Sequence, residues 1–297
     1  MSPTVEFASP RRLPRANRLA GRVVVIDIAF ASEGLGKGFA QTTGKFIQTL
    51  GPRLARWVDH HDHPRHADFL SDPRFVLATK QEHGACPEMI TPELVVETGP
   101  VDTILAHFDL DGIFAAAKWI LGGHEPYRGA DDDARVVDTR IGTASARATK
   151  IDFALRAHFR DAKLKQQVVR YLVGGCQQGP DFEAIDAAAG DYARMAAQSR
   201  HLAQEYKVEG QLAIVHIGSL DTRPFDKTEL LLIGQERATV SLVVDEANVT
   251  IAAPFDSGLN FVELFELGGG MPTRVNIPVK RLPEALALLH RRLDSSL

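Results

Sequence analysis

The sequence has little cysteine, no long apolar run and little net charge. Its 297 residues include two cysteines, Cys86 and Cys176, too few for a disulfide framework, which fits a protein of the reducing cytoplasm. No apolar run approaches the roughly 20 residues needed to span a bilayer, so no transmembrane helix is expected. The formal net charge of -4 gives no overall basic excess that would attract nucleic acid non-specifically, although a local basic groove is compatible with it.

Length and composition favour two globular domains. Apolar residues make up 44% of the chain and charged residues 24%, as in ordinary soluble proteins, and 297 residues exceed the usual size of one domain. Residues 1–22 carry five arginines without a hydrophobic segment, which predicts a mostly extended basic arm rather than a secretory signal. Phosphate binding by this arm is an alternative that the weak charge pattern leaves open.

The most informative stretch is a short apolar run, residues 101–106, that ends in polar residues. His107, Asp109 and Asp111 follow it in alternation, and Gly112 then opens an apolar helical pattern. Residues two apart at an extended strand end point to one side, so the three side chains can converge at the rim of a sheet. Gly112 is expected to let the chain turn sharply into the helix. One imidazole and two carboxylates form a ligand set for a hard divalent metal.

A second short strand, residues 23–26, ends at Asp27, which by itself could be a plain turn cap. The apolar residues between Phe39 and Trp57 are spaced mostly three and four apart, which predicts an amphipathic helix. The glycines at 34, 36 and 38 do not form a phosphate loop, because its spacing and its Ser or Thr are missing, and we expect a flexible loop there.

A group of histidines follows this predicted helix. Four of the chain's 11 histidines lie within seven residues, at positions 60, 61, 63 and 66, directly after Asp59. Histidine is a common metal ligand, and a neighbouring carboxylate often fixes its tautomer. The alternatives are a polar surface loop or a histidine-rich tract without fixed geometry.

One further carboxylate, Asp138, follows the strand-like residues 135–137. The nearby acidic run, residues 131–133, offers alternatives, although such a run is usually a solvated loop. Further candidates for phosphate contacts, each more often an ordinary histidine when taken alone, are His63, His66, His83 and His124. Glu88 lies near the start of a predicted helix, where a carboxylate favours the N-terminus.

The second half of the chain changes from helical to β-rich character. Residues 146–208 have helical patterns broken by glycine and proline, and we expect a helical connector there. Residues 209–297 predict a smaller α/β domain with a hairpin around residues 245–247 and a final amphipathic helix from about residue 283. Its glycines, Gly268, Gly269 and Gly270, can present backbone N–H groups to a phosphate or base edge, with Arg274 close by. A tight turn that needs positive φ is nearly as good an interpretation.

Together, Asp27, Asp59-His60-His61, the His107 to Gly112 motif and Asp138 resemble the DHH phosphoesterase superfamily. That superfamily includes RecJ-type exonucleases, nano-RNA and cyclic-dinucleotide phosphodiesterases, family II pyrophosphatases and exopolyphosphatases. The resemblance covers roughly residues 20–150, and more weakly the three glycines. The order differs from the family, because here the His107 motif follows Asp59-His60-His61, so the motifs look circularly permuted. Met271 also stands where relatives usually have histidine after the glycines.

The resemblance implies an α/β fold with a parallel-sheet DHH-like metal-binding domain at residues 23–145. It also implies two divalent metals, Mn²⁺ first, with Mg²⁺ or Co²⁺ as replacements. His107 and Asp109 would bind one ion, His60, Asp111 and Asp138 the other, and Asp27 would bridge them. Asp59 would orient His60, and His61 would face the substrate phosphate or leaving group. Gly268, Gly269, Gly270 and Arg274 would bind substrate.

These features predict two-metal hydrolysis at phosphorus in a small nucleotide or short oligonucleotide. A phosphoanhydride hydrolase, such as a pyrophosphatase or polyphosphatase, is the alternative, because the same chemistry serves both. A catalytically silent nucleotide-binding protein is a third hypothesis, which failure of the ligands to converge would support. Subunit number stays open, with a homodimer as one alternative.

Overall fold

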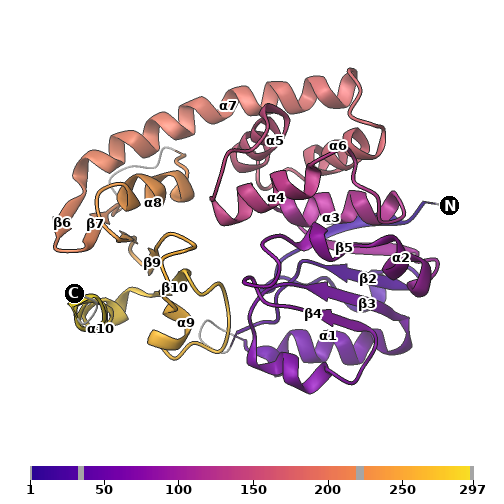
Figure 1. Cartoon of the computed structure of the whole chain (residues 1–297), viewed down its shortest axis with the longest axis horizontal. Helices are drawn as coiled ribbons and strands as arrows, with labels where there is room; N and C mark the ends of the chain where they lie inside the picture. The colour runs from indigo at the N-terminus through magenta and orange to yellow at the C-terminus, as the bar shows by residue number, and fades with distance from the viewer. Residues whose placement is uncertain (1, 33–36, 219–223, 295–297) are drawn as a thin grey trace. The chain divides into compact units, whose positions relative to one another are not determined.

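The computed structural model describes residues 2–32, 37–218 and 224–294. The chain forms two compact units, Met1–Asp191 and Tyr192–Leu297, and the long helix α7 (Pro180–Leu202) carries the chain from one to the other (Figure 1). Each unit is described by itself. Within the described ranges, no helix combines the length and the apolar character that crossing a lipid bilayer requires.

The first unit is built on a five-stranded sheet in the order β1-β5-β2-β3-β4, in which every pair is parallel. Its strands are β1 (Thr4–Ala8), β2 (Val23–Ile26), β3 (Leu54–Asp59), β4 (Phe75–Leu77) and β5 (Thr103–His107). The predicted α/β class with a parallel sheet is therefore confirmed. β1 lies within the predicted basic arm, so residues 4–8 are an edge strand of the sheet rather than a free extension.

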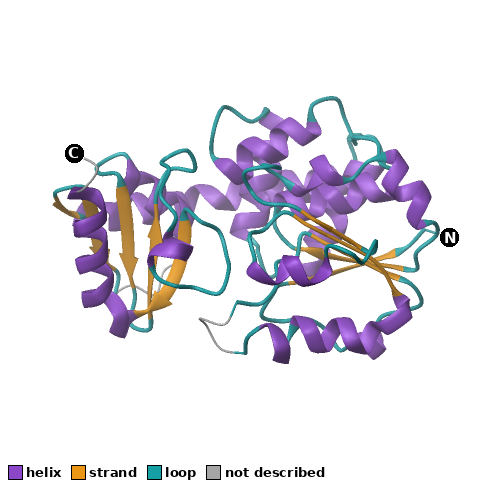
Figure 2. Cartoon of the chain, turned by 60° about the horizontal axis from the view of Figure 1, so that its bottom comes forward, coloured by secondary structure: helices purple, strands orange, loops and turns teal. Residues whose placement is uncertain are grey.

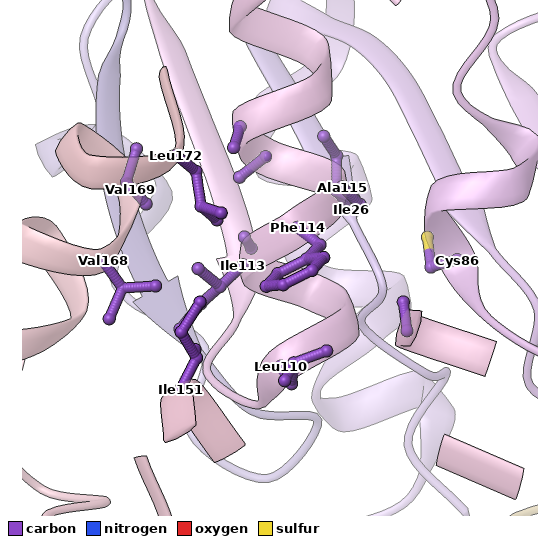
Figure 3. Close-up of a cluster of buried hydrophobic side chains, with 14 of the residues drawn as sticks. Ile26, Cys86, Leu110, Ile113, Phe114, Ala115, Ile151, Val168, Val169 and Leu172 are labelled. Carbon is purple, nitrogen blue, oxygen red and sulfur yellow. The ribbon is translucent and has the colours of Figure 1, made fainter. Parts of the chain in front are cut away.

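Helices cover both faces of this sheet because its central strands are apolar on both sides. Val24 and Ile26 of β2 join one core, whereas Val23 and Val25 join the other, as the alternation of a strand requires. One core receives side chains from α3 (Leu110–Ile120), α4 (Ala130–Thr139), α5 (Ala146–Ala157) and α6 (Ala162–Val173). Figure 3 shows side chains of α3, α5 and α6 together in this core. The opposite core contains residues of α1 (Thr43–Leu50), which lies across the sheet from these helices (Figure 1).

Shorter helical segments complete the first unit. They are α2 (Pro92–Thr98) and the 3-10 turns η1 (Ala16–Arg18), η2 (Phe39–Gln41), η3 (Gly51–Arg53), η4 (Pro64–Phe69) and η5 (Cys86–Met89). The residues predicted as a connector, 146–208, place α5, α6 and the first part of α7 in the core of this unit, through Ile151, Val168 and Ile185. That stretch is thus shared between the two units in the structure.

The prediction of one helix from Phe39 to Trp57 is wrong in its second half. The helix α1 ends at Leu50, and Gly51 with φ of 54° and Pro52 break it. Residues from Leu54 onward form β3, a strand that is buried at almost every position. Buried strands read as nearly continuous apolar runs, so the spacing of Leu50, Leu54 and Trp57 imitated a helical stripe.

The second unit contains a mixed sheet in the order β10-β9-β8-β7-β6, in which only the pair β7 and β8 is parallel. Its elements are η6 (Ala203–Glu205), β6 (Lys207–Glu209), β7 (Leu212–His216), α8 (Lys227–Gln235), β8 (Val240–Val244), β9 (Asn248–Ala252), α9 (Phe261–Leu264), β10 (Arg274–Pro278), η7 (Val279–Arg281) and α10 (Leu282–Asp294). α10 runs beside the sheet (Figure 2) and its Ala285, Leu289 and Leu293 share a core with Phe261. The predicted small α/β domain, its hairpin and its final helix are all present.

Candidate metal centre

Three neighbouring parallel strands bring the predicted ligands to one edge of the sheet. Asp27 follows β2, His60 and His61 follow β3, and β5 ends at His107. Because β5, β2 and β3 are adjacent and parallel, their carboxyl ends meet at the same edge. The permuted order of the motifs along the chain therefore does not prevent the side chains from converging.

Asp27 lies at the centre of this cluster. Its backbone takes the left-handed conformation, with φ of 59°, and its N–H donates to the Val58 carbonyl at 2.8 Å. Its Oδ1 is 3.2 Å from His60 Nε2, and its Oδ2 is 3.6 Å from His107 Nδ1. The side chain is 1% exposed, and neither oxygen has a hydrogen-bond partner. Burying a carboxylate without hydrogen bonds destabilises a protein unless a bound ligand, such as a cation, contacts its oxygens.

His60 is held in a metal-binding tautomer. Its Nδ1 is 2.8 Å from the His83 carbonyl oxygen, and since a carbonyl only accepts, Nδ1 carries the proton. Nε2, the atom that could bind a metal after losing its proton, then faces Asp27 and Asp111 Oδ2, the latter at 3.3 Å. A ring nitrogen donating to a carbonyl is the usual support of a ligating histidine.

The His107 motif divides between two sides of the cluster. His107 Nδ1 is 2.7 Å from Asp109 Oδ2, and Asp109 is the N-cap residue of α3. Asp111 lies in the first turn of that helix, where the Cys86 N–H donates to its Oδ2 at 3.3 Å. Convergence is as predicted, but Asp111 reaches the cluster from a helix rather than from an extended strand.

The side chains form three overlapping groups of three possible metal ligands. They are Asp27 with His107 and Asp109, His60 with Asp111 and Asp138, and Asp27 with His60 and His61. In each group the ligand atoms lie within 4.8 Å of one another. The first two groups match the two ligand sets that the DHH resemblance implies.

Asp138 belongs to the cluster, but its predicted strand is wrong. It lies in the last turn of α4, whose first turn holds the acidic residues 131–133, where carboxylates favour a helix N-terminus. Ala130, Ala134 and Val137 share a helical spacing and face the core, so the pattern of the segment is helical. The carboxylate of Asp138 forms an ion pair with the buried ammonium group of Lys80.

The expected role of Asp59 is also corrected. Asp59 Oδ1 is 2.8 Å from His61 Nδ1, so this fully buried carboxylate orients His61 and not His60. Residues next to each other at a strand end point to opposite sides, whereas residues two apart share a side, which explains the pairing of 59 with 61. The His83 carbonyl takes the orienting role at His60.

Charge in the metal-free cluster is balanced by protons. Burial lowers the pKa of His107, but its close contacts with the carboxylates of Asp109 and Asp27 raise it well above its ordinary value. For His60, burial and Lys80 lower the pKa, while Asp111 and Asp27 raise it further, so its pKa is also well above the ordinary value. Burial and Asp111 raise the pKa of Asp27, but His107 and His60 bring it down to about 2.

Lys80 was not predicted as a member of this site, and His83 and Glu88 have other roles in it than the ones predicted. Lys80 is 2% exposed, and a single lysine after a strand has no motif around it. Glu88 accepts from Arg135 and lies 3.3 Å from His83 Nδ1, so it supports the segment that holds His60. His83 contributes a backbone carbonyl, which no side-chain pattern can signal.

The predicted substrate residues lie in the second unit. Gly269 and Gly270 have φ of 129° and 133°, conformations that favour glycine, in the turn before β10. Arg274 begins β10, and its Nη1 donates to Thr228 Oγ1 at 3.1 Å. Of the glycine loop at 34–38, Gly34, Leu35 and Gly36 lie outside the described residues.

Comparison with known proteins gives structural neighbours only. No family model and no curated protein matches the chain. The chain is similar to the pGpG-specific phosphodiesterase PggH from Vibrio cholerae, with 12% identity, a TM-score of 0.46, and 93% of this chain and 99% of that chain covered. It is also similar to exonuclease RecJ bound to manganese, with 13% identity, a TM-score of 0.42, and 92% and 76% covered. The likeness is coarse at these values, so function must be read from the side chains themselves.

Proposed function

We propose that the chain is a divalent-metal-dependent phosphohydrolase of the DHH type. The observation that carries the proposal is Asp27, a buried carboxylate with two unpartnered oxygens between His60 and His107. His60 Nε2, His107 Nδ1 and Asp109 Oδ1 are likewise buried without a hydrogen-bond partner. Orphaned lone pairs aimed at a common region are what a cation site leaves when its ion is removed.

The donor set fits divalent metals, and Mn²⁺ is our first choice. Mixed imidazole and carboxylate ligands suit Mn²⁺, with Mg²⁺ or Co²⁺ as replacements. In the proposed centre, His107 and Asp109 would hold one ion, His60, Asp111 and Asp138 a second, and Asp27 would be shared. When bound, such ions activate water and stabilise the oxygens of a phosphoryl group during displacement.

His61 is the residue for which we propose a direct role on the substrate. Asp59 holds its Nδ1, and its side chain is 17% exposed, whereas the side chain of His60 is fully buried. An oriented imidazole of this kind can contact the substrate phosphate through Nε2 or give a proton to the leaving oxygen. We propose this role for His61, with Asp59 as its positioning residue.

A small nucleotide or short oligonucleotide is the substrate class that we propose. The backbone N–H groups of Gly268, Gly269 and Gly270 and the guanidinium of Arg274 would bind a phosphate or base edge of it. The two cysteines are free, which is in keeping with a proposed cytoplasmic location.

The test is hydrolysis of a substrate panel by the metal-free chain before and after addition of Mn²⁺ or Mg²⁺. The panel holds linear dinucleotides such as pGpG, cyclic dinucleotides, short RNA, pyrophosphate and polyphosphate. We expect turnover with Mn²⁺ that chelation abolishes and that Asp27→Asn lacks. Asp102→Asn is the matched control, since Asp102 is an exposed carboxylate that accepts the Arg22 N–H away from the cluster.

The panel also separates the alternatives. Preference for pyrophosphate or polyphosphate would replace the proposed substrate class with phosphoanhydrides. Binding of nucleotides without hydrolysis under any metal condition would support the catalytically silent protein and contradict the enzyme.

A further inference from the structure

Lys80 is a buried cation beside the candidate metal ligands. It lies three residues after β4, is 2% exposed, and its ammonium group pairs with Asp138. Its backbone N–H approaches Asp62 Oδ2 at 3.5 Å, which fixes the turn that carries it. A lysine that pairs with a carboxylate keeps its proton at neutral pH, so the ammonium group brings a positive charge to Asp138 in the metal-free protein.

The unpartnered ligand atoms are distributed unevenly over the cluster. Among the described residues, those of the Asp27 group include both oxygens of Asp27, His107 Nδ1 and Asp109 Oδ1. No oxygen of Asp111 or Asp138 is among the buried atoms without a partner; Asp111 Oδ2 accepts from the Cys86 N–H, and Asp138 Oδ2 pairs with Lys80. His60 Nε2 is the one unpartnered atom of the second group.

The two ligand groups also differ in how their carboxylates are neutralised in the metal-free protein. In the group of Asp27, His107 and Asp109, the two carboxylates pair only with histidines among the described residues, namely His60, His61 and His107, and no lysine or arginine pairs with them. The group of His60, Asp111 and Asp138 also has two carboxylates, but Lys80 already neutralises one of them. A dication entering this second group meets a fixed positive charge at Asp138, and like charges at short range repel strongly in a buried site.

We propose that Lys80 competes with the second metal ion for the Asp138 carboxylate, so that the two metal positions bind with unequal affinity and fill in order. The inference rests on the proposed metal centre and adds a determinant of its loading. The position at Asp27, His107 and Asp109 fills first. The position at His60, Asp111 and Asp138 fills at higher metal concentration, when the ion displaces the ammonium group from Asp138.

The experiment counts Mn²⁺ bound to the full chain, without substrate, by equilibrium dialysis and by the electron paramagnetic resonance signal of free and coupled Mn²⁺. For the unmodified protein we expect one tight equivalent and a second at least tenfold weaker. Lys80→Met keeps the length and bulk of the side chain but removes its charge, and it should tighten the second equivalent at least tenfold. Lys80→Arg keeps the charge and should keep the inequality.

Lys118→Met is the matched control. Lys118, on α3, is also buried and pairs with Asp131, which lies on α4 as Asp138 does. It donates to the Pro87 carbonyl at 3.0 Å, and Asp131 belongs to none of the ligand groups. Both Mn²⁺ affinities should stay as in the unmodified protein. Circular dichroism shows whether each variant is folded.

Several outcomes would overturn the inference. Two equivalents of equal affinity in the unmodified protein would refute it without any variant. If folded Lys80→Met binds the second Mn²⁺ ion with unchanged or lower affinity than the unmodified protein, the inference is also refuted. A lower affinity would mean that Lys80 orients Asp138 for the metal. If that variant does not fold, Asp138→Asn must remove only the weaker equivalent. Absence of any bound Mn²⁺ would refute the proposed function as well, whereas unequal binding without hydrolysis would refute the function alone.

Discussion

Gly112 offers a sharp test of how the first unit is packed around Asp27. It lies in the first turn of α3, and a Cβ atom built on it would be 2.7 Å from the His107 carbonyl oxygen and 2.9 Å from Asp27 Oδ2. Real Cβ atoms do not approach a backbone carbonyl so closely. Its φ is not among the positive values of the chain, so glycine is needed here for close approach and not, as predicted, for a sharp turn.

The magnitude follows from two opposing effects. Replacing glycine by alanine inside a helix normally stabilises a protein by about 0.4–1 kcal/mol, because the unfolded chain loses freedom. Overpacking a well-packed site costs about 1–3 kcal/mol. For Gly112→Ala the carbonyl belongs to the backbone of β5 and cannot move cheaply, so we expect a net loss of about 1–2 kcal/mol in the free energy of unfolding.

Gly190→Ala is the matched control, since Gly190 is also helical, within α7, and has nothing within 4 Å of its added Cβ. The free energy of unfolding of Gly190→Ala should be about 0.5–1 kcal/mol higher than that of the unmodified protein. Urea unfolding of the chelated proteins measures both values, and Mn²⁺ titration should show weaker binding only in Gly112→Ala, because Asp27 is displaced. A Gly112→Ala protein as stable as Gly190→Ala, with unchanged Mn²⁺ affinity, would refute this account of the packing.

Three further predictions concern the proposed metal centre and the proposed substrate residues. Because the pKa values of His60 and His107 are raised in the folded metal-free protein, their stabilisation is complete below about pH 6.5 and is lost as the pH rises through the folded values. The affinity for Mn²⁺ should instead rise with pH, by up to about tenfold per pH unit for each proton that binding releases. Calorimetry in buffers of different ionisation enthalpy measures both the affinity and the number of protons released, and binding that does not depend on pH would contradict this prediction. Asp59→Asn should lower kcat by about 10²-fold through the loss of His61 orientation while Mn²⁺ affinity is kept; loss of metal binding instead would show that Asp59 is a ligand. Arg274→Ala should raise KM about tenfold or more at unchanged kcat, since a hydrogen bond to a charged group is worth about 1.5–3 kcal/mol, and an unchanged KM would remove Arg274 from the substrate site.

The parts of the site that the sequence predicted best are those at strand ends. Asp27 follows and His107 ends a short, mostly apolar strand, and adjacent parallel strands bring such residues to one edge of the sheet. The signal depends on residue type and local pattern, not on the order of motifs along the chain. It therefore survived the permutation that sets this chain apart from the DHH superfamily it resembles.

What the sequence could not predict depends on long-range packing. Leu54 and Trp57 fit a helical stripe as well as a buried strand. The only local signal against a continuing helix is the break at Gly51 and Pro52. Lys80 reaches Asp138 across 58 positions of sequence, and such a pair has no local pattern. The orienting of His60 by a backbone carbonyl is likewise outside what side-chain motifs can report.

The most direct test of the central claim is anomalous diffraction at the manganese edge from crystals of the full chain grown with Mn²⁺. The account predicts a strong peak among Asp27, His107 and Asp109, and a weaker one among His60, Asp111 and Asp138 that grows with Mn²⁺ concentration. No anomalous peak at Asp27, or peaks only at exposed carboxylates elsewhere, would contradict the proposed metal centre.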